Sequence, residues 1–88
     1  MKVVILYRPN SEHARAVEEF IHDFKRQEAN RQVDVLNVDT VEGITAAKLY
    51  DVVQYPAIIA LTNDGQLLKA WQGEQLPLMN ELAYYASS

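Results

Sequence analysis

The chain has 88 residues, 49% of them apolar, with a net charge of −4 and no cysteine. This length and composition predict one domain with a single core. The acidic balance argues against nucleic acid and anionic membranes as partners, because both attract basic surfaces. The lack of cysteine excludes a disulfide, a thiolate zinc site and thiol chemistry. No apolar run approaches the ~20 residues of a membrane span and no signal peptide precedes the first strand, so a cytoplasmic location is expected.

The first third of the chain predicts a strand followed by a helix. Residues 2–7 are nearly continuous β-formers, as in a parallel strand covered on both faces. Pro9 ends this strand, and Asn10 or Ser11 is expected to cap a helix that continues to about residue 29. Its apolar residues, spaced i, i+3, i+4, i+7, predict one buried face. They are Val17, Phe20, Ile21 and Phe24, which we expect to pack with Ile5, Ile58 and Leu82.

A second strand and a short helix follow. Residues 33–38 alternate in polarity, which predicts a moderately exposed strand at the edge of a sheet. Asp39 and Thr40 are expected to cap a helix at about residues 41–50. We expect Ile44 and Ala47 on the inner face of this helix, and Gly43 weakens the prediction of its first turn.

The last part of the chain predicts a hairpin and a helix. Residues 57–62 and 66–71 read as strands around the turn 63–65, where Gly65 can take a positive φ. A helix starting near Pro77 would place Leu78, Leu82 and Tyr85 against the sheet. The predicted order is therefore β-α-β-α-β-β-α, an α/β fold with a four-stranded mixed sheet and helices on both faces.

This order, together with short motifs along the whole chain, resembles the thioredoxin-like superfamily. Tyr55-Pro56 is similar to the family's X-Pro pair, which is usually cis and opens the third core strand beside the active site. Further similarities lie at the end of the second predicted strand, before the proline and around the hairpin. They are Val38-Asp39, Tyr50, Gly65 and Gly73. The resemblance implies a single thioredoxin-like domain over residues 1–88.

The family's redox motif is missing. Ser11-Glu12-His13-Ala14 occupies the place of Cys-x-x-Cys, with Ser11 where the nucleophilic cysteine would stand and Ala14 where the resolving cysteine would stand. No thiol-disulfide oxidoreductase activity is therefore expected. A serine nucleophile needs a general base, and His13 has no third residue clearly placed to orient it, so a helix cap is the simpler interpretation of Ser11. No cluster of metal ligands is evident, and no metal or other cofactor is expected.

Two kinds of binding remain open at the vacated site. A helix start near Ser11, with Arg8 beside it, would suit an anion or a glutathione-type ligand. Alternatively, the resemblance implies that the backbone of Tyr55 can pair with an extended peptide, as in strand addition. We expect a redox-inactive protein- or peptide-binding module that is a monomer or a weak homodimer. A structural domain that self-associates through residues 33–38 is a further alternative. The expected groove comprises Tyr7, Arg8, Ser11, His13, Ala14, Tyr55, Pro56, Gln72 and Gly73, with Glu74 beside it.

Overall fold

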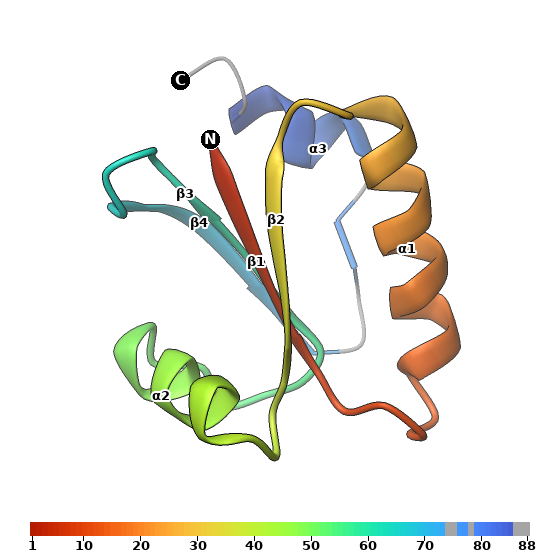
Figure 1. The fold of residues 1–88 in the computed structure, drawn as a ribbon, viewed down its shortest axis with the longest axis vertical. Coiled ribbons are helices and arrows are strands. Elements are labelled where there is room, and N and C mark those ends of the chain that lie inside the picture. The colour runs from red at the N-terminus through yellow and green to blue at the C-terminus, as the bar shows by residue number, and fades with distance from the viewer. Residues whose placement is uncertain (74–75, 78, 86–88) are drawn as a thin grey trace.

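The computed structural model describes residues 1–73, 76–77 and 79–85, and these form one sheet with helices packed against it (Figure 1). The order of elements is the predicted β-α-β-α-β-β-α, which confirms the fold class. The elements are β1 (Lys2–Tyr7), α1 (Ala14–Gln27), β2 (Gln32–Asn37), α2 (Val41–Leu49), β3 (Ala57–Leu61), β4 (Leu67–Gln72) and α3 (Met79–Tyr84). None of the helices in the described ranges is long and apolar enough to cross a membrane.

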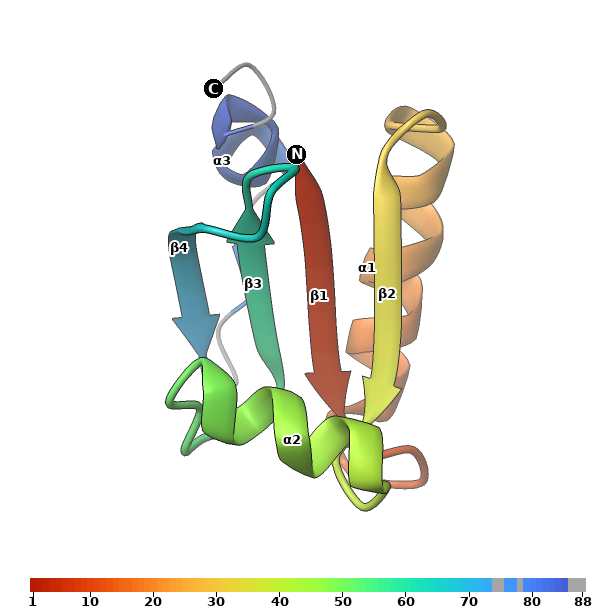
Figure 2. The same cartoon turned by 60° about the vertical axis from the view of Figure 1, so that its left-hand side comes forward.

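The sheet has the strand order β2-β1-β3-β4 (Figure 2). β1 runs parallel to β2 and antiparallel to β3, and β3 and β4 form the predicted hairpin. The two central strands, β1 and β3, are almost entirely buried, as their continuous apolar sequences indicate. β2 lies at an edge, as predicted, and it is only partly buried.

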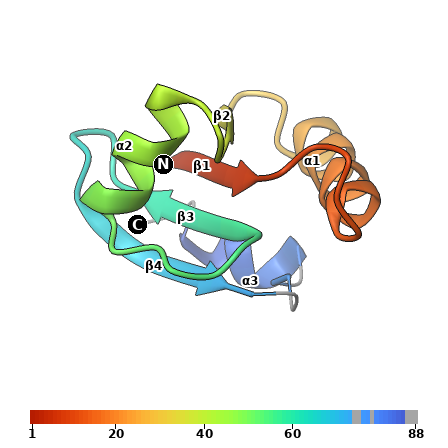
Figure 3. The same cartoon turned by 90° about the horizontal axis from the view of Figure 1, so that it is seen from below.

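Two apolar clusters hold the layers together, one on each face of the sheet. α1 and α3 cover one face and α2 covers the other (Figure 3). The first cluster contains the predicted face of α1, because Val17 and Phe24 are fully buried and Phe20 is 8% exposed. Ile21 is only partly buried at the margin of this cluster. Ile5, Ile58 and Leu82 belong to the same cluster, as expected.

The start of α1 differs from the prediction. The helix begins at Ala14, with His13 as its N-cap, and no side chain caps it. Asn10 takes a positive φ of 65°, outside the helical region, so the helix cannot continue back through it. The Ser11 hydroxyl donates a hydrogen bond to the Arg8 carbonyl instead of accepting one from a helix N–H, so Ser11 is not a helix cap. Residues 8–13 therefore form a turn-rich loop.

The inner face of α2 also differs from the prediction. Thr40 caps this helix, as expected, by accepting a hydrogen bond from the N–H of Gly43. Gly43 faces inward so closely that a Cβ atom there would lie 2.0 Å from the carbonyl oxygen of Asn37. Successive residues of a helix point about 100° apart, so Ile44 is turned outward and is 45% exposed. Ala47 is buried, as predicted.

The hairpin and last helix follow the prediction with small shifts. Gly65 has a φ of 93°, as its place in the turn requires. The pairing of β3 with β4 shifts between Ala60 and Leu61, and β4 begins at Leu67, one residue later than predicted. Leu82 is fully buried and Tyr85 packs against the first cluster. The predicted contact of Leu78 lies outside the described residues.

Candidate functional site

The candidate site lies at the end of the sheet where β1 and β2 finish and β3 begins (Figure 2). The loop of residues 8–13 follows β1, the Val38–Asp39 segment follows β2, and Tyr55–Pro56 precedes β3. α2 crosses this end of the sheet in the same view. The topology thus brings together the segments that the sequence analysis singled out, although they are far apart in the chain.

Arg8 forms an ion pair with Asp39. Its Nε lies 3.0 Å from Oδ2 and its Nη2 lies 3.1 Å from Oδ1, a two-pronged contact. This hydrogen bond, and then the charge of Asp39, raise the pKa of Arg8. The side chain of Asn37 in turn holds the Asp39 backbone by accepting its N–H. Because the carboxylate balances the guanidinium charge, Arg8 does not present an isolated positive charge to an anion.

Ser11 and His13 shape the loop rather than form a reactive pair. The Ser11 hydroxyl donates to the carbonyl of Arg8, and the N–H of Arg8 donates to His13 Nε2 over 3.3 Å. Both side chains therefore bind the backbone of the same residue. A nucleophile–base pair requires a hydrogen bond between the hydroxyl and the imidazole, and no such bond is present within the described ranges.

Tyr7 at the end of β1 and Ala14 at the start of α1 belong to the first apolar cluster. Tyr7 is buried, with 9% of its surface exposed, and its hydroxyl donates to Glu18 over 2.8 Å. Burial, followed by this hydrogen bond and the charge of Glu18, raises the pKa of Tyr7. Ala14 is also buried. These two predicted groove residues therefore support the loop from below and offer little surface to a ligand.

The segment around Tyr55–Pro56 is held in place from β4. The Tyr55–Pro56 peptide bond is cis, and Pro56 is fully buried. The side-chain oxygen of Gln72 accepts the N–H of Val53 over 2.9 Å and that of Gln54 over 3.3 Å. The N–H of Gly73 donates to the carbonyl of Pro56 over 3.0 Å. Gln72 and Gly73 thus fix the loop that presents Tyr55. Glu74 lies outside the described residues.

Tyr55 itself has an unusual backbone environment. Neither its N–H nor its C=O has a hydrogen-bonding partner among the residues that the structure describes. Its side chain is half-buried and packs against the second apolar cluster. Most backbone groups in folded proteins are paired with protein or water. Tyr55 therefore presents a backbone N–H donor and a C=O acceptor, both without partners among the described residues, on a segment that Gln72 and Gly73 hold in place.

An apolar hollow of about 410 Å³ adjoins Tyr55, and the sequence analysis did not identify it. It lies between side chains of α2 and the segment that follows that helix. The hollow is lined by Ile44, Ala47, Lys48, Asp51, Val52, Val53 and Tyr55. Val53 is 81% exposed, and Val41 at the start of α2 is 80% exposed. The sequence could have indicated this hollow, because α2 has more large apolar residues than one face of a nine-residue helix can bury.

In the described part of the chain, no three histidine or carboxylate side chains converge as potential metal ligands. His13 lies in the loop after β1, and His22 lies on α1 in a charged surface region with Glu18, Glu19 and Asp23.

No protein-family model matches the sequence, and no curated protein matches it significantly. Solved structures are similar in shape. Thioredoxin 1 from Thermosipho africanus superposes with a TM-score of 0.71 at 15% identity, over 99% of this chain and 91% of that one. Mitochondrial thioredoxin 3 from Saccharomyces cerevisiae gives 0.70 at 20% identity, over 93% and 72%. A structure described as a malarial protein gives 0.68 at 16% identity, over 97% and 91%. With its strand order and absent cysteines, the chain therefore has a thioredoxin-like fold without the Cys-x-x-Cys motif.

Proposed function

We propose that this domain binds an extended protein segment through the backbone of Tyr55, without redox chemistry. The observation that carries the proposal is the unpaired N–H and C=O of Tyr55 within the described ranges. An extended segment can add to such groups as a further strand, and its main-chain hydrogen bonds then supply affinity. The chain has no sulfur for thiol-disulfide exchange. Peptide binding, unlike thiol-disulfide exchange, does not need the cysteines that this chain lacks.

Two features around Tyr55 support this proposal. Gln72 and Gly73 already order the loop, so binding would cost little of the entropy otherwise lost in fixing it. The adjoining hollow beside Ile44 and Val53 offers apolar surface to a side chain of the bound segment. Burying one aliphatic side chain contributes about 1.5–3 kcal/mol. We therefore expect a partner segment with an aliphatic residue close to the residue that pairs with Tyr55.

The alternatives from the sequence have weaker support. An anion or glutathione-type ligand would need the positive charge of Arg8, which Asp39 already balances. The helix start also lies three residues beyond Ser11. Self-association through the edge of β2 stays a prediction. The cytoplasmic location also stays a prediction, which fractionation of native cells would test.

Peptide selection followed by backbone modification would test the proposal. Random peptides displayed on phage are selected on the immobilised domain, and one selected peptide is synthesised with each amide N-methylated in turn. We expect changes in the NMR chemical shifts of the Tyr55 and Val53 amides on binding. We also expect a loss of affinity when the peptide is methylated at the one or two amides that pair with Tyr55. A lost hydrogen bond of this kind costs about 1 kcal/mol or more, which is about fivefold or more in affinity.

Three results would contradict the proposal. One is that no selected peptide depends on any of its backbone amides. Another is that the shifts are confined to residues 8–14, which would favour the anion site. The third is that β2 amides move with protein concentration while Tyr55 stays unchanged on addition of peptide, which would favour self-association. The variant Tyr55→Phe serves as a control, because it keeps the backbone groups and should bind a strand-adding peptide normally.

A further inference from the structure

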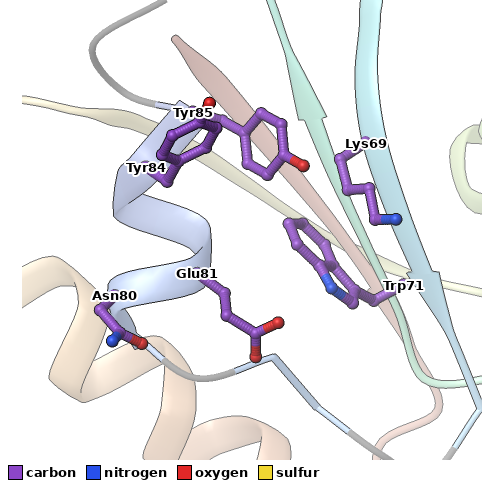
Figure 4. A pocket seen from close by; sticks show the side chains of 6 residues that line it. All are labelled: Lys69, Trp71, Asn80, Glu81, Tyr84 and Tyr85. Atoms are coloured by element: carbon purple, nitrogen blue, oxygen red, sulfur yellow. The ribbon is translucent and has the colours of Figure 1, made fainter.

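A second hollow of about 370 Å³ lies between β4 and α3, outside the set of residues that form the candidate groove. Figure 4 shows side chains of the strand and of the last helix gathered around it. Its lining combines aromatic rings with one acidic and one basic side chain. The lining residues are Lys69, Trp71, Asn80, Glu81, Tyr84 and Tyr85. The proposed peptide groove accounts for none of them.

The aromatic rings of this hollow stand nearly at right angles to one another. Trp71 and Tyr85 have ring centroids 5.8 Å apart and planes inclined by 74°. Tyr84 and Tyr85 are 5.1 Å apart and inclined by 90°. Tyr85 is therefore steeply inclined to both of its neighbours, so the cluster presents ring surfaces in different directions. The face of an aromatic ring carries negative charge density and attracts a cation within about 6 Å of its centre.

The fold holds part of this cluster rigid and leaves part of it accessible. Trp71 and Tyr85 are half-buried and pack against the first apolar cluster. Tyr84 is 70% exposed. The Glu81 carboxylate adds negative charge to the lining, while Lys69 contributes positive charge from β4. The chain as a whole carries −4. The three aromatic rings and the Glu81 carboxylate attract a cation, and only the Lys69 ammonium of the lining repels it. The lining therefore favours a cationic ligand that also has apolar surface.

We propose that this hollow binds an alkylammonium group. The methyl or methylene groups of such a cation would contact the rings of Trp71 and Tyr84, and its charge would interact with the ring faces and with Glu81. A compact anion would be attracted by the Lys69 ammonium and repelled by the Glu81 carboxylate. The same chemistry can come from a free small molecule or from a methylated lysine side chain, and the test separates these two sources.

The single tryptophan makes the test direct. Trp71 is the only tryptophan in the chain, so fluorescence and the one indole N–H resonance report on the hollow without ambiguity. The probes are choline, N-acetyl-trimethyl-lysine amide and 3,3-dimethylbutan-1-ol, which has the shape of choline without its charge. We expect both cations to give saturable changes, with choline about fivefold tighter than the neutral alcohol, since cation–π contacts contribute about 1 kcal/mol at such sites. Tighter binding of the lysine derivative would assign the hollow to a protein side chain, and tighter binding of choline to a small molecule.

Two charge variants should act in opposite directions. Glu81→Gln is expected to weaken choline binding about threefold, and Lys69→Gln to strengthen it about threefold, as for a unit charge several ångströms away at a hydrated surface. Tyr84→Leu removes an exposed ring and should weaken binding by a similar factor. Amide spectra confirm that each variant is folded. Three results would overturn the proposal. They are equal binding of choline and the neutral alcohol, no saturable change with either cation, and a change of choline affinity in the same direction for Glu81→Gln and Lys69→Gln.

Discussion

Gly43→Ala should destabilise the domain, although alanine is the better helix former. The substitution gains about 1 kcal/mol of helix propensity within α2. The new Cβ, however, would lie 2.0 Å from the Asn37 carbonyl oxygen, 2.7 Å from the Asn37 carbonyl carbon and 3.0 Å from the Cα of Val38. All three atoms are backbone and cannot rotate away. The helix would have to withdraw by about 1.5 Å to restore an ordinary contact of about 3.5 Å.

The expected loss follows from what that withdrawal disrupts. Overpacking of this kind costs about 1–3 kcal/mol. The movement would also strain the cap in which Thr40 accepts the Gly43 N–H over 3.1 Å, a contact that contributes about 1 kcal/mol. After the gain in propensity is subtracted, we expect a net loss of about 2 kcal/mol in the free energy of unfolding. For a domain of this size that lowers the melting temperature by about 10 °C.

Urea unfolding followed by helical circular dichroism and by Trp71 fluorescence measures this loss. Thr45→Ala is the matched control, because Thr45 is exposed on the same helix. It should be neutral or slightly stabilising, by at most about 0.7 kcal/mol. If Gly43→Ala is as stable as wild type or more stable, the close approach of α2 to the end of β2 is wrong, and with it the reason that Ile44 faces outward.

Other variants test the core, the buried tyrosine and the clamp on the Tyr55 loop. Phe24→Ala should lower the free energy of unfolding by about 3–5 kcal/mol in the same urea assay, because the ring is fully buried, whereas Lys25→Ala on the exposed side should change it little. The raised pKa of Tyr7 means that the folded state holds the hydroxyl proton more tightly than the unfolded state does. The protonated hydroxyl therefore contributes its full stability below the unfolded pKa of about 10, and this contribution is lost as the pH rises through the folded pKa. Melting temperatures should therefore fall less steeply above about pH 10 for Tyr7→Phe than for wild type, and equal slopes would contradict the assignment. Gln72→Ala removes the acceptor for Val53 and Gln54, so hydrogen exchange of these two amides should accelerate while that of Ile5 in the core does not change.

The sequence by itself determined the type and order of the elements. Continuous β-formers in residues 2–7 and 57–61 marked the central strands, because strands buried on both faces have no polar alternation. The spacing of Val17, Phe20 and Phe24 fixed the buried face of α1, since helical periodicity is local. The missing cysteines rule out thiol chemistry whatever the fold.

Tertiary structure decided how these elements meet. The start of α1 at Ala14 is an exception, because the contacts of Ser11 and His13 with the Arg8 backbone are local in the chain. The outward turn of Ile44 follows from the approach of Gly43 to β2, a contact between separate elements. The Arg8–Asp39 pair and the aromatic hollow between β4 and α3 likewise join segments distant in the chain. Propensity and periodicity report on neighbours in sequence, whereas binding sites are formed by neighbours in space.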